Sequence, residues 1–142
     1  MIAAVADTHT AIWFLYSDPR LFKGAYALID KAIADGNSIG VSAITVAEMV
    51  YLVEKERIPA NNLIGLPAAL ADPRSVFHPI PLDEAVTLKM VEVSRKDIPD
   101  LPDRIIAATA QLLGVPVLSR DSRIRSSAIT TIWWEGLIRP VG

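Results

Sequence analysis

Residues 102–121 read PDRIIAATAQLLGVPVLSRD, a stretch whose local chemistry marks a helix and the strand that follows it. The opening Pro-Asp pair suits a first helical turn, because proline has no N–H to leave unpaired there and an acid interacts favourably with the helix dipole. Gly114, with a proline two residues later, is typical of the end of a helix. This stretch therefore predicts a helix over Pro102–Leu113 and a buried strand over Val115–Ser119.

The rest of the chain repeats this alternation of short β-rich runs and longer helical ones. Further strands are expected at Ile2–Ala6, Ser38–Val41, Val76–Ile80 and Thr130–Trp133. Further helices are expected at Thr8–Tyr16, Arg20–Asp35, Ala43–Lys55, within Ala60–Ala71, and at Asp83–Arg95. Strands that alternate with helices predict an α/β fold, in which a mostly parallel sheet carries helices on both faces. No repeat or linker interrupts the pattern, so we expect a single domain over residues 1–142, with the tail 134–142 unassigned.

The composition argues against several classes of protein. The 142 residues include no cysteine, which leaves no disulfide framework, thiolate metal site or cysteine nucleophile. Fourteen basic and sixteen acidic residues give a net charge of −2, which argues against nucleic-acid binding through bulk positive charge. The apolar N-terminus stops at Asp7, which is too early for an export signal or a membrane span. We therefore expect a cytoplasmic protein with no membrane partner.

Four carboxylates fall near the ends of the predicted strands. Asp7 directly follows the first strand, and Glu48 lies about two turns into the helix after the second. Asp103 opens the helix before the fourth strand, and Asp121 follows that strand. Carboxylates gathered at one sheet edge would repel one another, and a hard divalent cation such as Mg²⁺ or Mn²⁺ would relieve that repulsion. The absence of cysteine and the presence of only two histidines argue against a zinc-type site.

Each of these acids also has a purely structural interpretation. Asp7 could cap the helix that follows it, and Thr45 with Glu48 has the spacing of a capping box. Asp103 could serve only the first turn of its helix, and Asp121 could cap a short turn. The combination is more informative than any single residue, because all four fall near the same predicted edge of the sheet.

The same residues resemble the PIN-domain ribonucleases. The resemblance rests on Asp-Thr-His at residues 7–9, on Ser-x-x-Thr-x-x-Glu at 42–48, and most specifically on DRIIAATA at 103–110. It continues with LGVPVLSRD at 113–121 and extends over residues 2–133, nearly the whole chain. The likeness is closest to the VapC toxins of toxin–antitoxin pairs. One departure is Ser119, where relatives often have threonine, and both residues carry a hydroxyl.

The resemblance implies a three-layer α/β/α sandwich with a five-stranded parallel sheet in the order 3-2-1-4-5. It implies that Asp7, Glu48, Asp103 and Asp121 form a catalytic, metal-binding quartet. The implied reaction is Mg²⁺- or Mn²⁺-dependent hydrolysis of an RNA phosphodiester, in which one metal lowers the pKa of a bound water and a second, if bound, stabilises the leaving oxygen. Glu48 could be a metal ligand or could orient the attacking water.

Other polar residues near these motifs could contact the substrate. The candidates are Thr8, Ser119, Arg120 and Arg123, with Thr8 also able to bond a carboxylate or a metal water. Arginine suits bidentate phosphate contacts, although surface salt bridges are the alternative. The resemblance also implies a homodimer and an antitoxin whose tail lies across the active site. We look for both surfaces on the apolar helical regions 20–35 and 43–71.

Two functions within the same family remain open at this stage. One is a PIN nuclease of RNA processing that has no antitoxin, and the other is a catalytically silent interaction module. The complete acidic quartet argues against a silent module.

Two other acidic α/β families fit the sequence poorly. A phosphoacceptor receiver domain would need paired acids after the first strand, where Asp7 stands alone. A haloacid-dehalogenase-like phosphatase would need Asp-x-Asp there, and the second position is His9.

Overall fold

The computed structural model describes residues 1–121, 124, 127, 131–133 and 137–139. Its strands are β1 (Ile2–Ala6), β2 (Ser38–Ser42), β3 (Phe77–Ile80), β4 (Val117–Leu118), β5 (Thr131–Trp133) and β6 (Leu137–Arg139). Its helices are α1 (Thr8–Leu15), α2 (Lys23–Ala34), α3 (Ala43–Glu54), α4 (Asn62–Ala71), α5 (Glu84–Lys89) and α6 (Leu101–Leu113), with a 3₁₀ turn η1 (Met90–Glu92). Within these ranges no helix is long and apolar enough to cross a membrane.

The strands form one sheet in the order β3-β2-β1-β4-β5-β6. The predicted order of the first five strands and their parallel pairing are confirmed. The sheet also has a sixth strand, β6, which pairs antiparallel with β5 and lies in the tail that the sequence left unassigned. The strand order reverses between β1 and β4, where Val5 pairs with Val117 and Ala6 with Leu118. Residues that follow these two strands therefore emerge side by side at one edge of the sheet.

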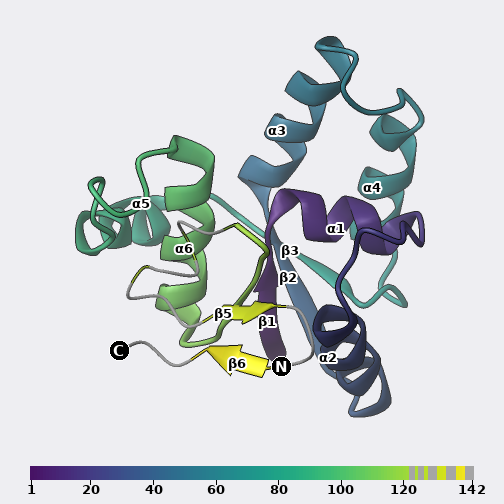
Figure 1. The fold of residues 1–142 in the computed structure, drawn as a ribbon, viewed down its shortest axis with the longest axis horizontal. Coiled ribbons are helices and arrows are strands. Elements are labelled where there is room, and N and C mark those ends of the chain that lie inside the picture. Colours follow the sequence, from purple (N-terminus) through teal and green to yellow (C-terminus); the bar gives the residue numbers. More distant parts are fainter. Residues whose placement is uncertain (122–123, 125–126, 128–130, 134–136, 140–142) are drawn as a thin grey trace.

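Helices cover both faces of the sheet, as the alternating pattern predicts (Figure 1). Figure 1 shows α1 to α4 on one side and α5 and α6 on the other. Strand β1 serves both layers, because Ala4 and Ala6 are buried in the core against α1–α4 while Val5 is buried in the core against α5 and α6. Successive side chains of a strand point to opposite faces, so one central strand contributes to two hydrophobic cores.

Helix α6 begins one residue before the prediction and ends where it was predicted to end. Asp100 caps its first turn by accepting a hydrogen bond from the Asp103 N–H at 3.1 Å. Gly114 follows the helix in the left-handed region with φ +69°, a conformation that suits glycine. The cap and the left-handed glycine together fix both ends of the helix that carries Asp103.

The prediction of one helix over Asp83–Arg95 is wrong in its second half. The regular helix α5 stops at Lys89, and η1 follows before the chain becomes extended at Val93. A tertiary contact explains the break, because Arg104 Nη2 donates to the carbonyl oxygens of Met90 at 3.0 Å and Val93 at 3.1 Å. The Met90 carbonyl also accepts the 3₁₀ hydrogen bond from the Val93 N–H at 3.0 Å, and the α-helical ladder does not continue.

Two other predicted elements are shorter in the structure, for local reasons. The helix predicted from Arg20 begins at Lys23, because Asp18 accepts hydrogen bonds from the Arg20 backbone at 2.8 Å and from its guanidinium at 2.7 Å, which holds a turn there. The strand predicted over Val115–Ser119 pairs only at its centre, since Pro116 has no N–H to donate to a neighbouring strand.

The buried face of α6 provides a test of this packing. Ile106 is fully buried, whereas Leu112 on the same helix is 42% exposed. Replacing Ile106 with alanine should lower the free energy of unfolding by about 2–5 kcal/mol, because it removes apolar contacts and leaves a cavity. Leu112→Ala is the matched control and should cost below about 1 kcal/mol. Urea denaturation of both variants measures the difference, and equal losses would contradict the placement of the core.

Candidate active site

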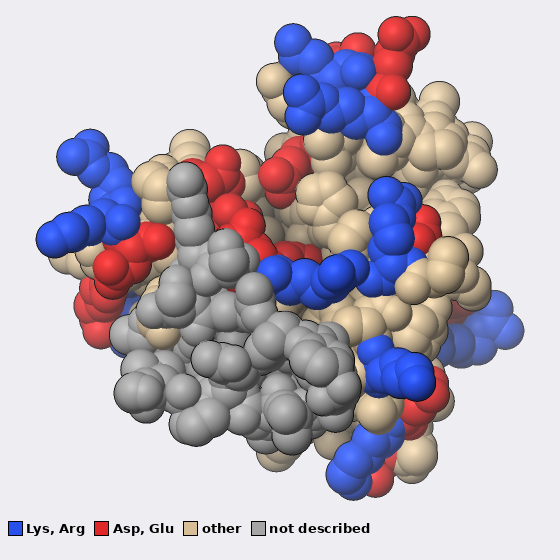
Figure 2. Space-filling view, in the orientation of Figure 1, with Lys and Arg blue, Asp and Glu red and all other residues tan. Residues whose placement is uncertain are grey.

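A cleft with a volume of about 630 Å³ opens beyond the carboxyl ends of β1 and β4. The four acids predicted from the sequence all line it: Asp7, Glu48, Asp103 and Asp121. In Figure 2, acidic groups gather in the hollow in the middle of this face, and basic groups lie beside it. The topology therefore brings together carboxylates that are far apart in the sequence.

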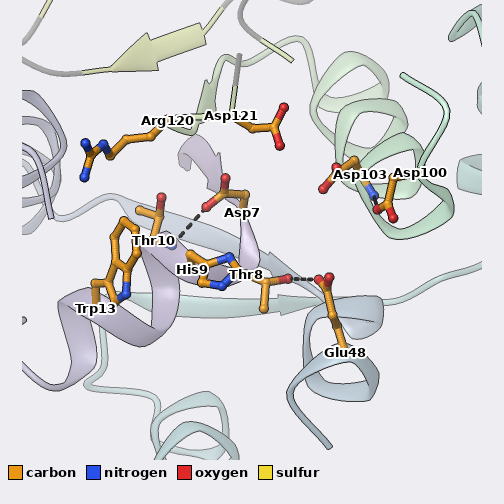
Figure 3. A pocket seen from close by; sticks show the side chains of 10 residues that line it. All are labelled: Asp7, Thr8, His9, Thr10, Trp13, Glu48, Asp100, Asp103, Arg120 and Asp121. Atoms are coloured by element: carbon orange, nitrogen blue, oxygen red, sulfur yellow. Dashed lines mark hydrogen bonds between the residues drawn. The ribbon is translucent and has the colours of Figure 1, made fainter. Parts of the chain in front are cut away.

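Asp7 is held at the junction of β1 and α1 by four hydrogen bonds. Its backbone N–H donates to the carbonyl oxygen of Leu118 at 3.1 Å, and its own carbonyl oxygen accepts from the Ala11 N–H. Its Oδ1 accepts from the backbone N–H of Thr10 at 2.9 Å, which caps α1. Its Oδ2 accepts from the Ser119 hydroxyl at 2.5 Å. The helix-cap interpretation of Asp7 is correct, and the same carboxylate also faces the cleft (Figure 3).

Ser119 joins the two acids that flank the switch point. Its hydroxyl donates to Asp7 and accepts a hydrogen bond from the backbone N–H of Asp121 at 2.9 Å. The residue is fully buried. Because Ser119 is buried and its hydroxyl is bonded to both Asp7 and Asp121, the structure favours a positioning role for Ser119 over the predicted substrate contact.

Glu48 reaches the cleft from α3, which begins at Ala43 directly after β2 and is capped by Ser42. The Thr8 hydroxyl donates a short hydrogen bond to Glu48 Oε1 and also lies 3.3 Å from the hydroxyl of Thr45. Thr8 is 3% exposed. Among the substrate, carboxylate and metal-water contacts predicted for Thr8, the structure favours the carboxylate contact, because the hydroxyl donates to Glu48.

The acids of the cleft raise the pKa of Asp103. Burial is the largest cause, and the negative charges of Asp100 and Asp121, followed by those of Glu48 and Asp7, add to it, so that the pKa rises to about 7. Figure 3 shows Asp103 and Asp100 together on one side of the cleft, with Asp121 above Asp7. Asp103 thus experiences the negative charge of the other four acids of the cleft.

Burial also raises the pKa of Asp7, although three local effects oppose it. The hydrogen bonds from Ser119 and Thr10 favour the charged form, and so does the nearby charge of His9. Burial disfavours the charged form of a carboxylate because it removes hydrating water, and hydrogen-bond donors stabilise that charged form. The hydrogen bonds and the charge of His9 therefore offset part of the effect of burial, and the pKa of Asp7 stays raised.

Basic and aromatic groups occupy the opposite side of the cleft from Asp103. In Figure 3, Arg120 lies above the Trp13 ring on that side. The guanidinium carbons of Arg20 and Arg120 are 5.2 and 5.9 Å from the centre of that ring, and the His9 ring is 5.5 Å away. Arg120 Nη1 also donates to the carbonyl oxygen of Arg20 at 2.9 Å. The cleft thus has an acidic side and a cationic, aromatic side.

The arginines near the acids in sequence have different positions in the structure. Arg120 lines the cleft as predicted, whereas Arg123 lies outside the described residues. Arg104 ties α6 to η1 through backbone carbonyls. Asp100 also lines the cleft and was not among the residues predicted from the sequence. The sequence does carry a signal for Asp100, because an aspartate just before a predicted helix, three residues before Asp103, is typical of an N-cap.

Among the described residues, no three Asp, Glu or His side chains are gathered tightly enough to hold a metal ion as they stand. The donor set nevertheless fits a hard divalent cation, because it offers only oxygen atoms. Burial and the negative charges of the neighbouring acids raise the pKa of Asp103. A divalent cation would relieve the repulsion among these acids, and Asp7, Asp103 and Asp121 are the residues that would hold it.

Comparison with known proteins gives relatives of the same architecture. The chain is similar to Ribonuclease VapC22 of Mycobacterium tuberculosis, with 28% identity over 126 residues that make up 89% of this chain and 92% of the relative. The structure of VapBC2 from Rickettsia felis, bound to a DNA fragment from its promoter, matches with a TM-score of 0.64 at 19% identity. That match covers 88% of this chain and 92% of the other, and it concerns the fold alone.

Two further solved structures have higher sequence identity. A toxin–antitoxin complex from Klebsiella pneumoniae matches with a TM-score of 0.58 and 26% identity, over 84% of this chain and 88% of that chain. FitAcB from Neisseria gonorrhoeae matches with a TM-score of 0.56 and 26% identity, over 86% and 88%. The PIN domain family itself matches residues 4–129, a range that contains all four predicted acids. The chain therefore belongs to the PIN-domain family.

Proposed function

We propose that this protein is a ribonuclease toxin of the VapC kind, which cleaves cytoplasmic RNA at the acidic cleft and is inhibited by a cognate antitoxin. The observation that carries the proposal is the convergence of Asp7, Glu48, Asp103 and Asp121 on one cleft at the switch point of the sheet. The similarity to Ribonuclease VapC22 supports the activity. The similarity to toxin–antitoxin complexes at 26% identity supports the antitoxin.

The reaction is hydrolysis of an RNA phosphodiester. Asp7, Asp103 and Asp121 would hold Mg²⁺ or Mn²⁺, and the bound ion would lower the pKa of water and neutralise charge on the phosphate. Ser119 keeps Asp7 in place and Thr8 keeps Glu48 in place. Glu48 is then available to hold the ion or to accept a proton from the attacking water.

Arg120 completes this division of roles. It lies across the cleft from Asp103, and a guanidinium there can bind a phosphate oxygen while the acids are engaged with the cation. This arrangement explains how a chain of net charge −2 can bind RNA. The attraction comes from the ion and a few arginines at the site, and it does not require a basic surface.

Exposed apolar side chains on α3 and α4 are where we place the protein partners. Tyr51 is 54% exposed and Ile64 is 75% exposed, and both belong to the region 43–71 that was predicted to carry such surfaces. Burial of large apolar side chains is a principal source of affinity between proteins. We propose that this region contributes to a homodimer contact and to antitoxin binding.

Replacement of Asp7 with asparagine tests the catalytic assignment. Asparagine keeps a side-chain oxygen for the α1 cap but removes the charge, so Mn²⁺-dependent cleavage of single-stranded RNA should be abolished while the fold is retained. Asp30→Asn, an exposed change on α2, is the charge-matched control and should retain activity. Gel-based cleavage assays with circular dichroism measure both properties. Full activity in Asp7→Asn would overturn the site assignment.

The raised pKa of Asp103 gives a prediction about pH. In protein without added metal, the Asp103 carboxyl should titrate near pH 7, because burial and neighbouring acids disfavour its ionisation in the folded state alone. Its contribution to stability is therefore full below about pH 4 and is lost as the pH rises through about 7. Carbon-13 NMR of labelled aspartate measures the titration.

The control for this titration is Asp100→Asn. Asparagine remains a good helix cap but removes one repelling charge, so the pKa of Asp103 should fall. Asp18, whose pKa is lowered to about 2 by Arg20, should show no change between pH 5 and 8 and serves as an internal reference. An Asp103 that titrates near pH 4 in the wild type would contradict the coupling of the acids.

A further inference from the structure

A second pocket lies directly beside the acidic cleft. Its volume is about 380 Å³, and the side chains of His9 and Trp13 line both it and the cleft. This volume is within the range of pockets that take small organic groups. An extended ligand with one group in the acidic cleft can therefore place its next group in this pocket, on the other side of Trp13.

The walls of this second pocket combine flat apolar surface with polar groups. The apolar and aromatic part consists of Ile12, Trp13, Tyr16, Leu52, Ile58 and Pro59. The polar part consists of His9, Asp18, Arg20, Arg57, Asn61 and Asn62. Apolar faces with a polar edge are the chemistry of a nucleobase, which stacks through its faces and forms hydrogen bonds through its edge.

Asn62 contributes an unused hydrogen-bond acceptor at the wall of this pocket. The residue is 2% exposed, and its Nδ2 donates to the carbonyl oxygen of Pro59 at 2.8 Å. Its Oδ1 is buried and has no hydrogen-bond partner among the described residues. Buried polar atoms are nearly always paired, so this oxygen indicates a missing donor. The oxygen lies just behind the surface of the pocket, so an N–H on the edge of a base would reach it through a shift of the Asn62 side chain.

Arginine side chains lie beside both pockets. The guanidinium groups of Arg20 and Arg120 both lie within 6 Å of the Trp13 ring that the two pockets share. Arg57 lines the second pocket and is exposed. Arg20 is paired with Asp18 at 2.7 Å, so Arg120 and Arg57 are the groups that match the phosphates on either side of a bound nucleotide. The charge pattern favours a nucleic acid strand over an apolar peptide segment.

We propose that the second pocket binds one unpaired base of the RNA, next to the phosphate that is cleaved in the acidic cleft. The proposal rests on the proposed ribonuclease function and adds a base-binding step to it. Trp13 and Tyr16 supply the stacking surface, and Asn62 reads an N–H of the base. Because a base must leave its helix to enter, the preferred substrate is a single-stranded segment or loop.

A scan with abasic nucleotides tests this proposal in the wild-type protein. A short single-stranded RNA that the protein cleaves with Mn²⁺ is resynthesised with one base removed at each position around the cut, and every phosphate is kept. Loss of stacking at the bound base should lower kcat/KM by about 5- to 150-fold at one position next to the cut. Uniform tolerance at all positions would overturn the base pocket and leave the proposed function standing.

Variants connect the sensitive position to the pocket. Trp13→Leu should lower kcat/KM on intact RNA and also abolish the penalty for the missing base, whereas Trp13→Phe should retain most of both. Arg57→Ala should flatten the slope of log KM against log salt by about 0.7, as expected for one lost phosphate contact to a single strand. Arg74→Ala removes the same charge outside both pockets and should leave the slope unchanged.

Two outcomes separate this proposal from its alternatives. If Trp13→Leu leaves cleavage of intact and abasic RNA unchanged but weakens inhibition by the antitoxin, the pocket binds protein and the proposal is overturned. If the folded wild-type protein cleaves no RNA with Mn²⁺, the proposed function fails, and the base pocket fails with it. Should Trp13→Leu not fold, the abasic scan and the comparison of Arg57→Ala with Arg74→Ala still decide.

Discussion

The hydrogen bond from the Ser119 hydroxyl to Asp7 is the interaction on which the site depends. It crosses the point where the strand order reverses, and the same hydroxyl accepts the N–H of Asp121. A single buried side chain thus fixes the two acids that emerge from β1 and β4. A hydrogen bond to an ionised carboxylate is stronger than one between neutral groups, and burial strengthens it further because water does not compete for the donor or the acceptor. Glu48 on α3 and Asp100 and Asp103 at the start of α6 line the same cleft as this pair.

The acids placed around this pair explain the polarity of the cleft. Burial, together with repulsion by these acids, raises the pKa of Asp103 to about 7, and this is an electrostatic cost to the folded state. Functional sites commonly hold groups with perturbed pKa values, because chemistry needs charge arrangements that stability alone would avoid. The cationic, aromatic side formed by Arg120 and Trp13 stands opposite the acids. A phosphate between them would contact positive charge from both directions once a cation is bound.

Much of the fold and of the acidic quartet could be predicted from the sequence, because both depend on local signals. The end of α6 follows from Gly114, and Asp7 directly follows a buried strand. What could not be predicted depends on contacts between distant residues. The break after α5 arises from Arg104, the buried role of Ser119 arises from strand pairing, and the second pocket arises from α1 lying beside α4. None of these contacts leaves a periodic or spacing signal in the chain.

The most direct test of the account is a calorimetric titration of Mn²⁺ into the wild-type protein and into Asp103→Asn. If the acids of the cleft form a cation site, the wild type should bind Mn²⁺ and release protons at pH 7, because the cation displaces the proton from the Asp103 carboxyl, whose pKa is raised to about 7. Asp103→Asn should bind Mn²⁺ more weakly and release fewer protons. A folded wild-type protein that binds no divalent cation, or a variant that binds it equally well with the same proton release, would contradict the account.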